Sequence, residues 1–153
     1  MTMPPFTIII DTREQAPYTF DSINPKPNTI TLGLKTGDYS LDGFEDRITI
    51  ERKSLSDLYG SVGMGRDRFE REIARMVDMY FAAVVIEADW KTIIQNPPVR
   101  SKMSPKSVLA TICAWMQRYR VHWITCPNRM FAEKITYRLL DRWYRDEDTG
   151  LHQ

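Results

Sequence analysis

The clearest regular pattern in the chain is a set of short apolar segments with the length of β-strands. Residues 6–11 (FTIIID) and 81–87 (FAAVVIE) are almost continuously apolar, which is typical of strands buried on both faces. Residues 47–53 (RITIERK) alternate between polar and apolar positions, as in a strand with two different faces. Three further segments, at residues 29–34, 38–41 and 121–126, bring the prediction to about six strands.

Between these strands, apolar residues recur with the spacing of amphipathic helices. Residues 66–80 form the first long helix of this kind, with an inward face of Phe69, Ile73, Met76, Val77 and Tyr80. Ser104 and Pro105 are an N-cap and a first-turn proline, and they predict the start of another helix. A terminal helix is expected from Pro127–Asn128 to about Tyr144, and a short one over residues 54–59. Strands and helices that alternate in this way predict an α/β fold around a mixed sheet.

The length and composition indicate a protein with one hydrophobic core. With 153 residues, of which 42% are hydrophobic, we expect a single domain over residues 1–145 and a disordered tail at 146–153. No apolar run approaches the roughly 20 residues that span a bilayer. The segment MTMPPF also lacks a basic region followed by an apolar one. We therefore expect an intracellular protein that is not secreted and has no membrane partner.

The candidate chemistry lies between residues 37 and 57 (GDYSLDGFEDRITIERKSLSD). On a strand over residues 47–53, Glu51 and Lys53 share one face and Arg52 points to the other. The hairpin signal at 42–43 brings Asp38 back beside them. Carboxylates and an ammonium group on one face suit metal-dependent hydrolysis of a phosphodiester. Taken alone, such a short charge run is more typical of a solvated strand end.

The spacing of the whole segment resembles the signature of the XPF-type structure-specific DNA endonuclease family. The resemblance rests on Gly37-Asp38, on Glu51-Arg52-Lys53 and on Asp57 four residues later. It continues upstream in residues 11–14 (DTRE) and downstream in Gly65-Arg66, and covers about the first ninety residues. It implies a restriction-endonuclease-like core with a mixed central sheet of about six strands flanked by helices. It also implies a divalent-metal-dependent DNA endonuclease that acts on branched, flap or nicked DNA.

The resemblance suggests roles for the acidic residues. Asp38 and Glu51 would be the main metal ligands, with Asp11 close by and Glu14 as an outer contributor. Two carboxylates about 4 Å apart repel by roughly 4 kcal/mol at an effective dielectric of 20, so acids gathered around one point call for a cation. Oxygen ligands without nearby Cys or His favour Mg²⁺ or Mn²⁺ over Zn²⁺. Asp11 and Glu14 by themselves would also fit ordinary turn chemistry at a strand end.

Three further residues complete the predicted catalytic set. Lys53 would position or activate the attacking water, and Arg52 would support the site. Asp57 has two interpretations, because it can accept hydrogen bonds from Arg52 or from backbone amides, or act as a first-turn acid suited to the helix dipole.

The formal net charge of +1 does not by itself indicate a nucleic-acid-binding protein, so DNA would have to meet a local basic patch. The predicted DNA-binding residues are Arg13, Arg66, Arg68, Arg71 and Arg75. The last three follow one flank of the helix over 66–80 and would neutralise phosphates. They equally fit a solvated face with Arg68–Glu72 and Arg75–Asp78 ion pairs.

Two other functions remain open. One is a nuclease of another branch of the same fold class, such as a RecB-like exonuclease or a junction resolvase. The spacing of Glu51-Arg52-Lys53 and Asp57, with Gly65-Arg66, favours the XPF type. The other is a non-catalytic DNA-binding partner of a second nuclease, although such copies lose acidic or lysine positions that this chain retains. Larger family members continue into a tandem helix-hairpin-helix module, which does not fit after Tyr144, so a separate DNA-binding protein is a possible partner.

The terminal helix carries apolar residues in two arcs. One arc, expected to dock on the core, consists of Phe131, Ala132, Ile135, Leu139 and Trp143. The second arc, roughly opposite, consists of Met130, Tyr137, Leu140 and Tyr144. A helix that is apolar on two sides needs two partners, so we predict a homodimer through this helix.

Overall fold

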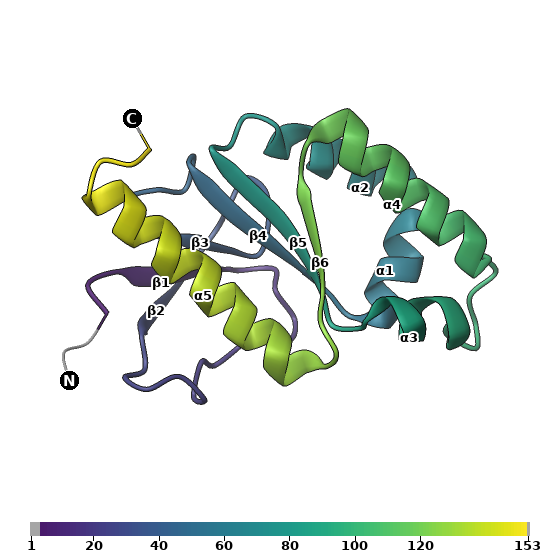
Figure 1. Cartoon of the computed structure of the whole chain (residues 1–153), viewed down its shortest axis with the longest axis horizontal. Coiled ribbons are helices and arrows are strands. Elements are labelled where there is room, and N and C mark those ends of the chain that lie inside the picture. Colours follow the sequence, from purple (N-terminus) through teal and green to yellow (C-terminus); the bar gives the residue numbers. More distant parts are fainter. Residues whose placement is uncertain (1–3, 153) are drawn as a thin grey trace.

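A mixed β-sheet runs through the centre of the protein, as the computed structural model of residues 4–152 shows (Figure 1). Its strands are β1 (Thr7–Asp11), β2 (Asn28–Leu32), β3 (Tyr39–Leu41), β4 (Ile48–Lys53), β5 (Phe81–Ile86) and β6 (His122–Thr125). Their order across the sheet is β2-β1-β3-β4-β5-β6. The predicted set of six strands is confirmed within the described residues.

Strand direction follows from the connections. The short hairpin between β3 and β4 makes that pair antiparallel, and β3 is also antiparallel to β1. Longer connections that contain helices join β4, β5 and β6, which are parallel to one another. β1 and β2 are also parallel, and β2 is exposed along its whole length. The carboxyl ends of β1 and β4 and the start of β3 therefore meet at one edge of the sheet.

Helices cover both faces of this sheet. They are α1 (Leu55–Val62), α2 (Arg66–Met76), α3 (Trp90–Gln95), α4 (Pro105–Tyr119) and α5 (Arg129–Asp148). Helices α1 to α4 enclose one core cluster with β5, centred on residues such as Phe69, Ile73 and Trp115. α5 and the segment around Tyr18 and Phe20 enclose the other, against β1, β3 and β4 (Figure 1). The result is a three-layer arrangement of helices, sheet and helix.

Side-chain caps define where several helices begin. Ser54 accepts from the backbone N–H of Asp57, and Asp57 accepts from Ser54 N–H, which forms a capping box at α1. Ser104 caps α4 with Pro105 in its first turn, as predicted. Helix α2 ends earlier than expected, at Met76, and the expected core residues Val77 and Tyr80 are exposed. The reason is that the chain must turn within four residues to enter β5.

The end of the chain differs from the expected disordered tail at residues 146–153. Helix α5 continues to Asp148, and backbone N–H groups of Thr149 and Gly150 bond to its last turn. The His152 ring lies 4.7 Å from the Trp143 ring. Residues 146–152 are thus held by hydrogen bonds and aromatic packing, and Gln153 lies outside the described residues.

The face that α5 presents to the core also differs from the prediction. Tyr137 and Leu140, expected to lie on the outer arc, are buried, and the Tyr137 ring lies 6.1 Å from that of Phe6. Phe131, expected to dock, is 45% exposed. The buried arc combines residues of both predicted arcs, because the sheet and the N-terminal segment together determine which side faces inward. The argument for a homodimer from two opposite apolar strips is therefore wrong.

None of the helices in the described part of the chain has the length and hydropathy needed to cross a bilayer.

Candidate active site

A polar pocket of about 360 Å³ opens at the sheet edge where β1, β3 and β4 meet, against helix α2. Its lining residues are Asp11, Arg13, Gln15, Lys35, Gly37, Asp38, Glu51, Arg68, Glu72 and Arg75. Acidic groups and cations from four parts of the chain therefore share one pocket. The sequence predicted six of these ten residues as functional.

Gly37 allows Asp38 to enter this pocket. Its φ of +81° lies in the left-handed region, and a Cβ at this position would overlap the Thr49 side chain. Asp38 is then held from three directions. Its N–H donates to Ile50 O at 2.9 Å, its carbonyl accepts from Asp11 N–H at 2.8 Å, and its Oδ2 accepts from Arg52 N–H at 2.7 Å. The glycine of the Gly-Asp pair is thus a geometric requirement of the site.

The strand pattern of residues 47–53 places the next two groups. Glu51 and Lys53 lie on the same side of β4, with Lys53 Nζ 2.9 Å from Glu51 Oε2. Lys53 Nζ also lies 4.3 Å above the centre of the Phe69 ring, which contributes a cation–π contact from α2. The predicted orientation of both side chains is confirmed.

The acids of the pocket oppose one another electrostatically. Burial, followed by the charge of Glu51, raises the pKa of Asp38 to about 9. Burial and Glu51 also raise the pKa of Glu72. Removing water from neighbouring carboxylates favours their neutral forms unless a cation compensates the charge.

These residues fit a hard divalent cation. Mg²⁺ is usually held by one or two carboxylates, and water and substrate phosphates complete its octahedron. Asp38 and Glu51 supply two such carboxylates, with Glu72 nearby. Among the described residues, no three acidic, His or Cys side chains converge closely enough to hold an ion without further ligands. The donor set therefore matches a cation that shares its ligands with the substrate.

Asp11 lies in the pocket, but its oxygens are occupied. It accepts from Arg13 Nε at 2.9 Å and from Leu34 N–H at 2.8 Å, and its side chain is 3% exposed. Burial raises the pKa of this carboxyl, but the hydrogen bonds from Arg13 and Leu34 lower it more, so the net shift is downward. Asp11 thus contributes negative charge at the pocket and fixes its rim.

Glu14 is not in the pocket, in contrast to the expected gathering of four acids. Both of its carboxylate oxygens accept from Arg52, from Nε and Nη2 at 2.9 Å each, and the two side chains are 3% and 8% exposed. Arg52 points to the opposite side of β4 from Glu51, so Glu14 follows it there. Asp57 is mainly the capping acid of α1, and its Oδ2 lies 3.9 Å from Arg52 Nη2.

A buried ionic network around Arg52 continues beyond the predicted residues. Arg52 Nη1 donates to Glu87 Oε1 at 3.0 Å, and the other oxygen of Glu87 accepts from Tyr18 Oη at 2.7 Å and Arg129 Nη1 at 3.1 Å. We call Glu14, Arg52, Glu87, Tyr18 and Arg129 the arginine network. The sequence could have indicated Glu87 as a site residue, since it directly follows a buried strand adjacent to β4. The sequence could not have indicated Arg129, because its hydrogen bond to Glu87 depends on how α5 packs.

The five predicted DNA-binding arginines lie in three different settings. Arg68 and Arg75 line the pocket, together with Arg13, whose side chain is 70% exposed. Arg71 is exposed but is not part of the pocket lining. Arg66 serves the fold, because it donates to Thr111 Oγ1 at 2.7 Å and lies 5.0 Å from the Trp115 ring centre.

The alternative explanation of the arginine face, a solvated face with ion pairs, is contradicted only in its ion pairs, because Arg68, Arg71 and Arg75 are exposed. Neither Arg68–Glu72 nor Arg75–Asp78 is within ion-pair distance among the residues from 4 to 152. The pocket also contains two charged residues that the sequence did not indicate as functional, Glu72 and Lys35. Glu72 could have been found from helical spacing, since it lies four residues after Arg68.

Comparisons with known proteins agree with this geometry. Residues 10–139 match the model of the ERCC4 domain, whereas no curated protein matches the sequence. XPF from Aeropyrum pernix superposes with a TM-score of 0.66 and 20% identity, over 91% of this chain and 60% of that chain. The same protein in a complex with DNA gives a TM-score of 0.66 and 21% identity, over 93% and 66%. The chain thus spans about two thirds or less of these structures.

The predicted α/β fold with a restriction-endonuclease-like core and the predicted XPF-type nuclease domain are both confirmed by these matches. Most of the residues discussed above, from the end of β1 to the middle of α5, lie inside the matched range. The chain therefore belongs to the ERCC4 domain family.

Proposed function

We propose that the protein is a DNA endonuclease that hydrolyses phosphodiester bonds with Mg²⁺ or Mn²⁺, on branched, flap or nicked DNA. Family membership supports a nuclease. The observation that carries the proposal is the presence of Asp38 and Glu51 in one pocket, with the Lys53 ammonium group 2.9 Å from Glu51. Acidic residues at its base would hold the cation, and basic residues at its rim would hold phosphate.

Each residue has a defined part in the proposed reaction. Asp38 and Glu51 would hold the cation, which polarises the phosphate and lowers the pKa of bound water. The Lys53 ammonium group, fixed between Glu51 and the Phe69 ring, would orient the attacking water and stabilise charge that develops on the phosphate. Glu72 offers a further acceptor at the same pocket.

The rim would position the DNA. Arg13, Lys35, Arg68 and Arg75 reach the pocket from both of its sides, from the segments after β1 and β2 and from α2. Cations on both sides of the acids suit a backbone that passes across the pocket with phosphates before and after the one cut. Lys35 joins the predicted arginines in this role.

Cleavage of end-labelled DNA tests the proposal. We expect product from flap, fork, nicked or junction DNA with Mg²⁺ or Mn²⁺ and none in EDTA. Glu51→Gln should remove activity, whereas Glu45→Gln, the same change at an exposed acid outside the site, should not. DNA binding without cleavage of any substrate in either metal would instead indicate the non-catalytic partner role, and digestion from DNA ends would indicate an exonuclease.

Self-association stays part of the proposal, on a different basis from the two strips. Met130 and Phe131 are 63% and 45% exposed near the start of α5 and could meet a second copy. Sedimentation at micromolar concentration, with wild type and Phe131→Glu, tests this. A wild-type monomer would remove the homodimer and leave room for a separate DNA-binding partner.

A further inference from the structure

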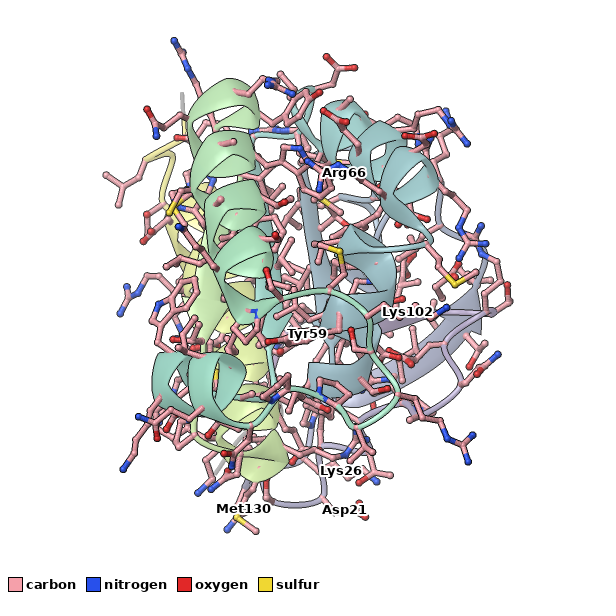
Figure 2. All side chains as sticks on the ribbon, turned by 90° about the vertical axis from the view of Figure 1, so that its right-hand side faces the viewer. Asp21, Lys26, Tyr59, Arg66, Lys102 and Met130 are labelled. Carbon is pink, nitrogen blue, oxygen red and sulfur yellow. The ribbon has the colours of Figure 1, made fainter. Side chains whose placement is uncertain are left out.

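A second hollow, of about 520 Å³, lies along helix α1 on the helical side of the sheet. Its walls are α1 itself, the turn at residues 63–64 and the segment at residues 98–103 before α4. Figure 2 shows the connection between α3 and α4 crossing in front of α1, with Tyr59 and Lys102 labelled on this face and Arg66 farther along it. This hollow shares no lining residue with the catalytic pocket.

The lining combines an apolar interior with two cations. Met103 and Met64 provide the apolar contacts. Tyr59, which is only 2% exposed, closes the floor of the hollow, and its hydroxyl donates to Ile93 O at 2.6 Å. Arg100 and Lys102 are exposed at its margin, and none of its ten lining residues is acidic. An apolar hollow with only positive charge suits a ligand that has a flat apolar part and an anionic part. A nucleotide has both.

Gly60 provides a second observation. It lies inside α1, where glycine costs about 1 kcal/mol relative to alanine. A Cβ at Gly60 would meet no atom within 4 Å, so the packing of this chain does not require glycine there. The space that a side chain would enter belongs to the hollow. The chain thus keeps this wall bare at a cost to its own helix, which is understandable if another molecule occupies the space.

The position of the hollow relative to Lys53 indicates which nucleotide of a DNA substrate would lie in it. Ser56, which lines the hollow, is only three residues beyond Lys53 at the end of β4. From there α1 extends for eight residues, or roughly 12 Å at 1.5 Å per residue. A DNA strand held at Lys53 can therefore reach the hollow within a few nucleotides of the cleaved bond.

We infer that this hollow binds one unpaired nucleotide of the DNA substrate, a few positions from the cleavage point. The base enters over Gly60 and against Met103 and Met64, and its phosphates contact Arg100 and Lys102. A base that remains paired in a duplex cannot enter, so occupancy distinguishes DNA with a single-stranded arm from plain duplex. The inference rests on the proposed DNA endonuclease function, and it names a feature that would select the substrate.

The test measures DNA binding in EDTA, where no cleavage occurs. Two ligands are compared, a blunt duplex and the same duplex with a single-stranded arm, with 2-aminopurine placed in turn at each of the first arm positions. We expect a fluorescence change at one arm position with the wild-type protein. Gly60→Leu fills the hollow, so it should lose this change and bind the arm about tenfold more weakly, with unchanged affinity for blunt duplex.

Two further variants keep the test decisive. The exposed pair Arg100→Ala and Lys102→Ala leaves the helix intact, and it should reduce the salt slope for the arm by about 0.7 for each phosphate that is no longer neutralised. Lys106→Ala, an exposed cation of α4 outside the hollow, is the matched control and should change nothing. If Gly60→Leu does not fold, the Arg100 and Lys102 variant provides the result.

The outcomes separate this inference from the proposed function. Equal losses for both ligands, or wild-type binding of the arm by the altered proteins, would overturn the hollow as a nucleotide site. Selective loss of arm binding supports it, even if no DNA is ever cut in Mg²⁺ or Mn²⁺. In that case the endonuclease proposal fails while the nucleotide site stands.

Discussion

Strand β4 directs Glu51 and Lys53 toward α2 and Arg52 toward α5. The charges of the carboxylates are compensated differently on these two sides. On the α5 side, the arginine network satisfies both oxygens of Glu14 and both oxygens of Glu87 with short hydrogen bonds. On the α2 side, the carboxyls of Asp38 and Glu72 have raised pKa values, because burial and Glu51 oppose their ionisation. One side is electrostatically complete, whereas on the other the buried carboxyls oppose one another's ionisation.

This difference teaches how three consecutive residues can carry separate tasks. Because successive strand residues point to opposite faces, Arg52 fixes the position of β4 while its neighbours stay available for chemistry. We call the α5 side of β4 the closed side and the α2 side the open side. Arg52 N–H also donates to Asp38, so a residue of the closed side helps to hold a residue of the open side. The comparison predicts that substitutions on the α2 side reduce activity, and those on the α5 side reduce stability.

The largest effect is expected at the open side. Glu51→Gln should reduce cleavage below detection, and Lys53→Met should reduce it by about 10²–10³-fold, because each removes a charged group next to the reacting phosphate. Both proteins should keep the wild-type circular dichroism spectrum and melt cooperatively. Wild-type cleavage rates in either folded variant would show that the open side is not the reaction centre.

At the closed side, Arg52→Ala should lower the free energy of unfolding by about 3–5 kcal/mol, since it leaves Glu14 and Glu87 buried without their shared partner. Urea denaturation measures this loss. Lys26→Ala, which breaks an ion pair with 54% and 71% exposed side chains, is the control and should cost less than about 1 kcal/mol. Similar losses in the two variants would contradict the distinction between the two sides.

Asp38→Asn should separate stability from activity. The pKa of Asp38 is about 9 in the folded protein and near 3.8 when unfolded, so between these values the unfolded chain releases a proton that the folded one retains. The stabilisation is complete below pH 3.8 and is lost as pH rises toward 9. In EDTA, Asn should therefore raise the melting temperature at pH 8 more than at pH 5. In Mg²⁺, the same variant should lose cleavage. A variant less stable than wild type at pH 8 would refute this electrostatic account.

The smallest effect concerns the basic rim of the open side. Arg68→Ala and Arg75→Ala should each make the salt dependence of DNA affinity shallower by about one unit of slope, because each removes a phosphate contact. Arg71→Ala, on the same helix but outside the pocket lining, is the matched control. Equal changes for all three arginines would show that the pocket does not position the DNA.

The sequence alone determined the local geometry of the site. Alternation along residues 47–53 placed Glu51 and Lys53 on one face, because side chains of a strand point to opposite sides in turn. The Gly37-Asp38 pair, the hairpin before β4 and the caps at Ser54 and Ser104 are also local features. Each depends on backbone preferences of a few neighbouring residues, which sequence patterns represent directly.

Only the tertiary structure decided which distant charges meet. Glu14 bonds to Arg52 although it belongs to the motif that suggested a shared acidic site, and Glu72 enters the pocket in its place. The inward side of α5, with Tyr137 buried and Phe131 exposed, likewise depends on Phe6 and the sheet. The physical reason is that long-range pairing is set by the packing of the layers, and the hydrophobic effect that drives this packing has no direction along the chain.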